Sequence, residues 1–257
     1  MHPNILRVLW ALMLAAAPVS AAAPAAFERA NQQFAAGEFA AAAAAYEQVL
    51  NNDGPRAAVF YNLGNSYQRL GQYGPAILAY ERARLLSPRD PDLLANLALA
   101  RKAATAFEES SPRPRLDAAL CYLSRNEWSW LVAGAALGLG TLAVLAALMP
   151  MPRRGPRQTV LAVTVLAVTA LAVLAIAAGA TALYQRRDEA ALGIVLTDKA
   201  TVRLSPFENA ESLGTPGVGR SVRLRGTSGA FRYIEVAGTS LHGWLAARDV
   251  AAITPEP

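Results

Sequence analysis

Sulfur and imidazole are both scarce in this chain. Among its 257 residues there is a single cysteine, Cys121, which excludes an internal disulfide and leaves no sulfur-rich metal cluster. We expect Cys121 to be an unreactive buried or interfacial thiol, with a redox role as the alternative. The only histidines are His2 and His242, so histidine-based catalytic triads and metal sites lack the residues that they need.

The carboxylates form no acid–base pair either. They are scattered, or they lie at helix-surface positions where ion pairs are the expected role, as for Glu81 beside Arg82 and Arg84. Residues 214–221 nearly spell a phosphate-binding loop, but that loop needs a lysine where Arg220 stands and a long helix after it, so we read a glycine-rich turn. We therefore expect no catalytic residue, no metal site and no cofactor, in a protein that is not an enzyme.

Charge is scarce as well: 17% of the residues are charged, whereas 54% are hydrophobic. This composition is too apolar for an ordinary soluble domain, and the excess lies in two uncharged runs, Leu131–Met149 and Thr159–Tyr184. At about 1.5 Å per residue, both runs are predicted to cross a hydrocarbon core of about 30 Å. The proline-rich link between them predicts a transmembrane helical hairpin. Gly134 and Gly138 form a small-residue pattern that is expected to dock the two helices against each other. The alternative is that these glycines have no docking role.

The N-terminus has the pattern of a targeting signal. Arg7 precedes an apolar stretch and a run of small residues, which predicts a secretory signal peptide over residues 1–23, with an uncleaved anchor helix as the alternative. Translocation then places the segment before the first run in the periplasm, the link at 150–158 in the cytoplasm, and the tail in the periplasm again. The net charge of +5 comes from arginines beside the hydrophobic runs, so we do not expect nucleic-acid binding.

Small and aromatic residues recur with a period of about 34 residues in the N-terminal part. This spacing is typical of the tetratricopeptide repeat, in which two antiparallel helices approach closely at small residues, here Gly64 against Ala76. Residues 91–102 repeat only the first helix and are expected to cap the array. A cap is needed because two repeats are at the lower limit of stability for a solenoid. The second copy is carried by Phe60, Leu63, Gly64, Tyr67, Gly71, Tyr73, Ala76, Tyr80, Ala83 and Pro88, and the first by Gly37, Phe39, Ala42 and Tyr46.

The first helix of each repeat is expected to line a concave surface. Asn31 and Asn65 lie one period apart on it, with Arg69 and Lys102 on the same side. This set predicts a groove in which amides and cations hold an extended peptide or an acidic terminus. The alternative is that these are ordinary polar residues, and that Asn62 and Asn96 cap or bridge the repeats.

From about residue 190 the pattern changes to short alternating runs, which predict a small all-β barrel. Residues 202–206 (Val-Arg-Leu-Ser-Pro) and the pair Gly243-Trp244 resemble motifs of the bacterial SH3-like domain. Phe207 and His242 are the expected surface residues, and Tyr233 and Trp244 are expected in the core rather than in a binding platform. The predicted strands are Gly193–Thr197, Thr201–Leu204, Ser221–Arg225, Phe231–Val236 and Gly243–Ala246.

The chain is thus expected to be multidomain, with an all-α tetratricopeptide solenoid, two transmembrane helices and a small SH3-like barrel. This order of parts, with repeats ending in Ala76–Ala83 and the helix Asn96–Arg101, resembles BatE proteins of the Bat aerotolerance operons of bacteria. The expected parts are a signal peptide (1–23), repeats with a capping helix (24–108), a linker or interfacial segment (109–127), a first transmembrane helix (128–149), a cytoplasmic loop (150–158), a second transmembrane helix (159–184) and the SH3-like domain (190–254).

The resemblance implies association with von Willebrand factor A-domain membrane proteins and, indirectly, with a MoxR-type ATPase. We therefore expect an inner-membrane scaffold whose repeats and SH3-like domain face the periplasm. The alternative is a cell-wall sensor or anchor that grips peptidoglycan or peptide with its SH3-like domain.

Overall fold

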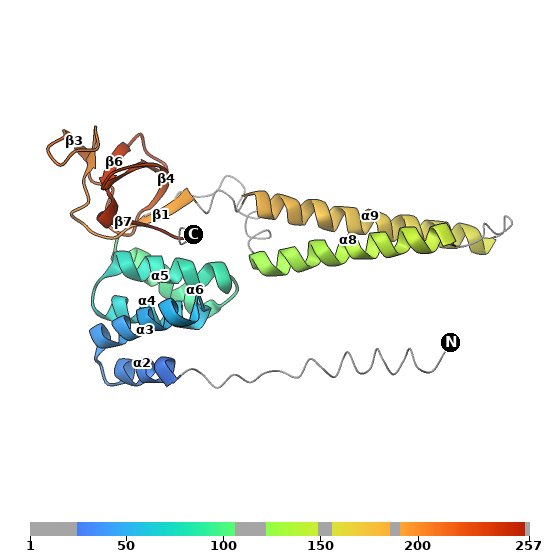
Figure 1. The fold of residues 1–257 in the computed structure, drawn as a ribbon, viewed down its shortest axis with the longest axis horizontal. Helices are drawn as coiled ribbons and strands as arrows, with labels where there is room; N and C mark the ends of the chain where they lie inside the picture. The colour runs from blue at the N-terminus through green and yellow to red at the C-terminus, as the bar shows by residue number, and fades with distance from the viewer. Residues whose placement is uncertain (1–24, 106–121, 149–155, 186–190, 255–257) are drawn as a thin grey trace.

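The computed structural model describes residues 25–105, 122–148, 156–185 and 191–254. These residues form a stack of short helices, a pair of long helices and an antiparallel sheet (Figure 1). The predicted signal peptide, Cys121 and most of the predicted linker lie outside the described residues.

The stack of short helices, here called the repeat domain, comprises residues 25–105. Its helices alternate in direction and pack in sequence order, so that two helix pairs are followed by a single helix. Apolar side chains from every helix meet in two adjoining clusters, which form a continuous core through the domain. The helices are α2 (Ala25–Ala35), α3 (Phe39–Asp53), α4 (Ala57–Arg69), α5 (Tyr73–Leu86) and α6 (Pro91–Ala103).

Local sequence signals set the ends of these helices. Gly37 and Gly71 lie at the turns between the helices of each pair, and their φ angles of 81° and 71° place them in the left-handed region that favours glycine. The side chain of Asp90 accepts hydrogen bonds from two amides in the first turn of α6, and Pro91 follows it at the first helical position.

The close approach of α4 to α5 depends on Gly64, but its partner differs from the one predicted. A Cβ atom at Gly64 would lie 2.5 Å from Cε1 of Tyr80, so it is this aromatic ring, rather than the side chain of Ala76, that occupies the space beside the glycine. Ala76 and Tyr80 are both fully buried. The smaller partner was predicted because small residues favour close packing, whereas here one large ring fills the gap left by the glycine.

The two long helices, α8 (Arg125–Leu148) and α9 (Pro156–Gln185), lie side by side and run away from the rest of the protein (Figure 1). Their close contact is at Gly179, where a Cβ atom would lie 2.3 Å from a methyl group of Val132. The prediction that Gly134 and Gly138 dock the helices is wrong, because a Cβ atom at either position would meet nothing within 4 Å. These two glycines instead line an open apolar groove beside Val168.

Among the described residues, one helical stretch is long and apolar enough to cross a membrane by length and composition. It is Thr164–Tyr184 of α9, with a mean hydropathy of 2.3. The sequence predicted two such helices. Side chains of α8 are described only as far as Leu142, so the described part of its apolar run falls short of the roughly 20 residues that a spanning helix needs.

The C-terminal part, here called the β-domain (residues 191–254), is one antiparallel sheet in the order β3-β2-β6-β5-β4-β1-β7. All five predicted strands are present, and β3 and β7 are additional. Those two are the edge strands and have no pairing with each other, so the sheet is not a closed barrel. The strands are β1 (Leu192–Val195), β2 (Val202–Arg203), β3 (Ser212–Gly214), β4 (Ser221–Ser228), β5 (Phe231–Val236), β6 (His242–Ala246) and β7 (Val250–Ala252).

The two sequence motifs of the β-domain lie next to each other. Arg203 of β2 is the register partner of Trp244 of β6. Gly243 lies beside Trp244 with a φ angle of 152°, and a Cβ atom there would lie 2.5 Å from the carbonyl oxygen of Arg203. The glycine is therefore required for β2 to approach β6. Of the glycines in residues 214–221, Gly214 ends β3, and Gly217 and Gly219 lie in the connection to β4, which is a strand and not a helix.

Candidate functional site

The first helices of the repeat domain are joined by a ladder of amide and phenol groups. In the first repeat, the hydroxyl of Tyr46 donates to Oδ1 of Asn31 over 2.7 Å. Nδ2 of Asn62, from the next first helix, donates to the same oxygen over 3.1 Å. One carbonyl oxygen thus connects three helices, α2, α3 and α4.

The same arrangement recurs one repeat later. The hydroxyl of Tyr80 donates to Oδ1 of Asn65 over 2.7 Å, and Nδ2 of Asn96 donates to that oxygen over 3.0 Å. The Tyr80 hydroxyl also lies 2.7 Å from Oε1 of Gln68. The alternative role foreseen for Asn62 and Asn96, bridging between repeats, is therefore present in the structure.

The amide nitrogens of Asn31 and Asn65 remain available for a ligand. Both side chains are half-buried, and their oxygens are the atoms used in the ladder. Within the described part of the chain, no hydrogen bond occupies either nitrogen. Each amide therefore presents two N–H donors that are held in place by the bonds to its oxygen.

Burial extends to higher pH the range in which the two tyrosines of the ladder stay protonated and able to donate. Loss of solvent raises the pKa of the Tyr46 phenol; the nearby amide of Asn62 opposes this increase, and the Glu28 carboxylate adds to it. Burial likewise raises the pKa of the fully buried Tyr80 phenol. Both phenols are neutral at physiological pH, as an ordinary tyrosine is, and the raised pKa values keep them neutral to higher pH.

The two predicted cations lie at different places. The guanidinium of Arg69 stacks over the ring of Phe39, 4.5 Å from its centroid, and so connects the second repeat to the first. Lys102 is exposed in the last turn of α6. The structure thus places Asn31 and Asn65 in equivalent hydrogen-bonded clusters one repeat apart, whereas Arg69 and Lys102 stand at the ends of α4 and α6.

One carboxylate predicted at the surface is buried. Glu81 is 1% exposed and bonds to Arg84 over 2.8 Å and to Arg101 of α6. Its predicted neighbour Arg82 points elsewhere, toward the β-domain. The prediction of a surface ion pair missed this burial because α6, which brings Arg101, covers this side of α5.

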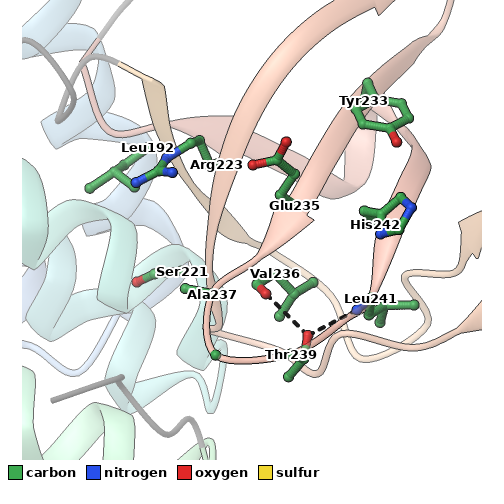
Figure 2. A pocket seen from close by; sticks show the side chains of 11 residues that line it. Leu192, Ser221, Arg223, Tyr233, Glu235, Val236, Ala237, Thr239, Leu241 and His242 are labelled. Atoms are coloured by element: carbon green, nitrogen blue, oxygen red, sulfur yellow. Dashed lines mark hydrogen bonds between the residues drawn. The ribbon is translucent and has the colours of Figure 1, made fainter.

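A second candidate site is a cavity of about 570 Å³ on the β-domain. Figure 2 shows Arg223, Glu235 and His242 along its wall, and these three residues are register partners on the neighbouring strands β4, β5 and β6. Nε of Arg225 donates to Glu235 over 3.1 Å, and the imidazole of His242 lies 6.4 Å from the ring of Tyr233. The cavity therefore combines charged and aromatic side chains.

The expected burial of Tyr233 and Trp244 is wrong. Both are half-buried and lie on the outer face of the sheet, where their rings make an edge-to-face contact at 5.3 Å, whereas Ile234 and Leu245 fill the inner core. A strand alternates its faces, so neighbours in sequence must lie on opposite sides. Phe207 is 68% exposed in the turn after β2 and does not line the cavity with His242.

Comparison with known families locates the repeat in the sequence. A family model described as "Tetratricopeptide repeat" matches residues 57–90, which span α4 and α5. The helix pair α4–α5 is a tetratricopeptide repeat. Such repeats generally mediate protein–protein interactions, so the match indicates an interaction role for the repeat domain. No curated protein matches the chain.

The asparagines were predicted from the sequence as site residues, whereas Tyr46 and Tyr80 were predicted only as members of the repeat and not as the donors that fix the asparagines. The signal was present, because Tyr46 and Tyr80 lie the same repeat length apart as Asn31 and Asn65. The charged residues of the β-domain cavity were also missed. They were detectable as the outward positions of the alternating strands, opposite the inward Val222 and Ile234.

Proposed function

We propose that this protein is a non-enzymatic, membrane-anchored scaffold or adaptor of the bacterial cell envelope, whose repeat domain binds extended segments of other proteins. The observation that carries the proposal is the pair of fixed amides at Asn31 and Asn65, each with its nitrogen available. An extended peptide presents carbonyl oxygens at regular intervals, and oriented N–H donors are suited to hold them. Lys102, exposed at the end of α6, favours an acidic segment or terminus.

Membrane anchoring is supported by the surface of the long helices. Leu137 on α8 and Leu166, Leu171 and Leu174 on α9 are each more than half exposed, which is costly in water and favourable in lipid. Trp130 lies near the start of α8 and Tyr184 at the end of α9, and both are more than 70% exposed. These two helix ends are adjacent in Figure 1, and aromatic residues are enriched at such positions near a membrane surface. We propose that α8 and α9 cross the membrane as a hairpin.

The proposed cellular location and partners rest on the order of the parts along the chain, which resembles that of BatE proteins. We propose that the repeat domain and an SH3-like β-domain face the periplasm of a bacterial inner membrane and gather A-domain membrane proteins, linked to a MoxR-type ATPase and to aerotolerance. The predicted signal peptide and the hairpin both support this side of the membrane.

The test is a substitution that removes the donors and keeps the ladder. In Asn65→Asp, the carboxylate still accepts from Tyr80 and Asn96 but has no N–H to offer. We expect co-purification of A-domain membrane proteins in mild detergent to fall at least about tenfold. This is the effect expected when one charge-assisted hydrogen bond or two ordinary ones are lost. The matched control is Gln48→Glu, the same amide-to-acid change on an exposed position of α3. Undiminished capture by Asn65→Asp, with the fold retained, would contradict the proposal.

A second candidate function is recognition of the cell wall or of peptide by the β-domain. The observation that favours it is the outward position of Tyr233 and Trp244 beside the charged cavity, since aromatic faces with nearby polar groups bind sugars and peptides. Binding of the full chain to purified sacculi, lost in Trp244→Ala and retained in Asn65→Asp, would favour this function over the first.

A further inference from the structure

The β-domain packs against the repeat domain, although residues 106–190, which include both long helices, separate them in the chain. Figure 1 shows β1 and β7 lying along α5. At the centre of the contact, Nε of Arg82 donates to the carbonyl of Ile253 over 3.1 Å, and its Nη2 donates to the carbonyl of Ala252 over 2.9 Å. These carbonyls belong to the edge of the sheet, which would otherwise present unpaired acceptors.

The backbones of the two parts touch at a second point. Gly74, in the first turn of α5, is buried, and a Cβ atom there would lie 2.3 Å from the carbonyl oxygen of Leu196. No L side chain fits in that space without movement of the backbone. Around this point, Leu78 of α5 shares one apolar cluster with Ile194 and Ile253 of the β-domain, both almost fully buried.

The first repeat shows what this face looks like when nothing covers it. Gly74, Leu78 and Arg82 are four residues apart and form one stripe along α5. One repeat length earlier, α3 has Ala40, Ala44 and Gln48 at the same positions, and all three are exposed. The second copy therefore carries a small, an apolar and a cationic residue on the face where the β-domain lies.

We infer that the β-domain is the end cap of the helical repeats, and that residues 25–105 and 191–254 fold as one unit into which the long helices are inserted. Each repeat buries its apolar face only against a neighbour, so an array of two repeats and one helix leaves its last face open. The third repeat has no second helix among the described residues, and β1 and β7 cover α5 instead. The end of α6 is covered too, since Ala104 lies in the same cluster as Val218 of the β-domain.

This arrangement does not depend on the proposed partner or on the asparagine ladder. It does restrict how the chain meets a membrane, because two parts that pack on each other lie on the same side. Any crossings between Thr105 and Leu192 must then be even in number. The docked unit leaves the amides of Asn31 and Asn65 uncovered, since no β-domain residue bonds to them within the described ranges.

The test uses opposite substitutions at equivalent positions of the full chain in detergent. Alanine is the better helix former, so Ala40→Gly is expected to lower the melting temperature by about 2–4 °C. In an uncovered helix, Gly74→Ala would raise it by a similar amount. If the β-domain is docked, Gly74→Ala instead lowers it by about 3 °C or more, because the new methyl group meets the Leu196 carbonyl. A melting temperature raised by Gly74→Ala overturns the inference.

A second variant removes the polar contact without adding volume. Arg82→Met retains an apolar chain and loses both bonds to the sheet edge, and Gln48→Met is its control on the exposed face of α3. With docking, Arg82→Met is expected to speed amide hydrogen exchange about tenfold or more in both α5 and the segment 250–253, while Gln48→Met leaves both unchanged. Faster exchange confined to α5 would mean that the two parts fold separately and would refute the single unit.

Discussion

The contact between Gly64 and Tyr80 makes the repeat domain sensitive to a single methyl group. In Gly64→Ala, the new Cβ would lie 2.5 and 2.6 Å from two ring carbons of Tyr80. The ring is fully buried, and its hydroxyl donates to Asn65 over 2.7 Å and also lies 2.7 Å from Oε1 of Gln68. A sideways shift of the ring away from the methyl group would displace this hydroxyl from Asn65.

Two effects of opposite sign decide the size of the change. Alanine stabilises a helix relative to glycine by about 0.5–1 kcal/mol, whereas overpacking a well-filled core costs about 1–3 kcal/mol. The strain dominates, because distances near 2.5 Å are far inside van der Waals contact. We expect Gly64→Ala to lower the free energy of unfolding by about 1–2 kcal/mol.

The assay is denaturant unfolding of the full chain in detergent, followed by far-ultraviolet circular dichroism. Gly134→Ala is the control, since its Cβ meets nothing within 4 Å and the change is expected to be neutral or slightly stabilising. In a double-mutant cycle, Tyr80→Leu should cost less in the Gly64→Ala background than alone, by about 1 kcal/mol, because the smaller side chain relieves the strain. A stability for Gly64→Ala equal to or above that of the parent chain would refute this account of the packing.

Two further predictions concern protonation and helix capping. The pKa values of Tyr67 and Tyr80 are raised from the ordinary 10.0, mainly by burial, so the unfolded chain ionises first. Stability is therefore fully present below about pH 10 and falls above it, by at most about 1.4 kcal/mol per pH unit for each tyrosine; titration of the unfolding free energy should show a shallower fall for Tyr80→Phe. Asp90→Ala removes the cap of α6 and is expected to cost about 1 kcal/mol in the same unfolding assay, and Asp90→Asn, which keeps an acceptor, should recover most of it.

Helices and inner strands were predictable because their signals are local. The repeat spacing defined α4 and α5, and Gly37 and Gly71, which belong to the repeat pattern, both have positive φ in the turns between paired helices. The edge strands β3 and β7 were not predicted. Each has three residues, which is too short for alternation to be recognised in the sequence, and neither contains a motif such as the one at residues 202–206 that includes the equally short β2.

The candidate site was predictable in its positions but not in its bonds. The repeat length placed Asn31 and Asn65 on equivalent helices, while the atoms that they use depend on the packing of α3 and α5 behind them. The burial of Glu81 is another such case. Its sequence neighbours suggested an exposed ion pair, and only the arrival of α6 with Arg101 removes the carboxylate from water.

The docking of the β-domain is nonlocal, yet the sequence holds a trace of it in the differences between its two repeats. Positions that support the repeat itself are alike in both copies, as at Tyr46 and Tyr80. Positions that meet a neighbour found at only one repeat are free to differ: the first copy has Gln48 where the second has Arg82, which bonds to carbonyls of the sheet edge. Two copies of an internal repeat can therefore be compared with each other. Where both copies share a fold but one has an exposed stripe and the other has small, apolar or charged residues at the same positions, the second stripe indicates a face that packs against another part of the protein.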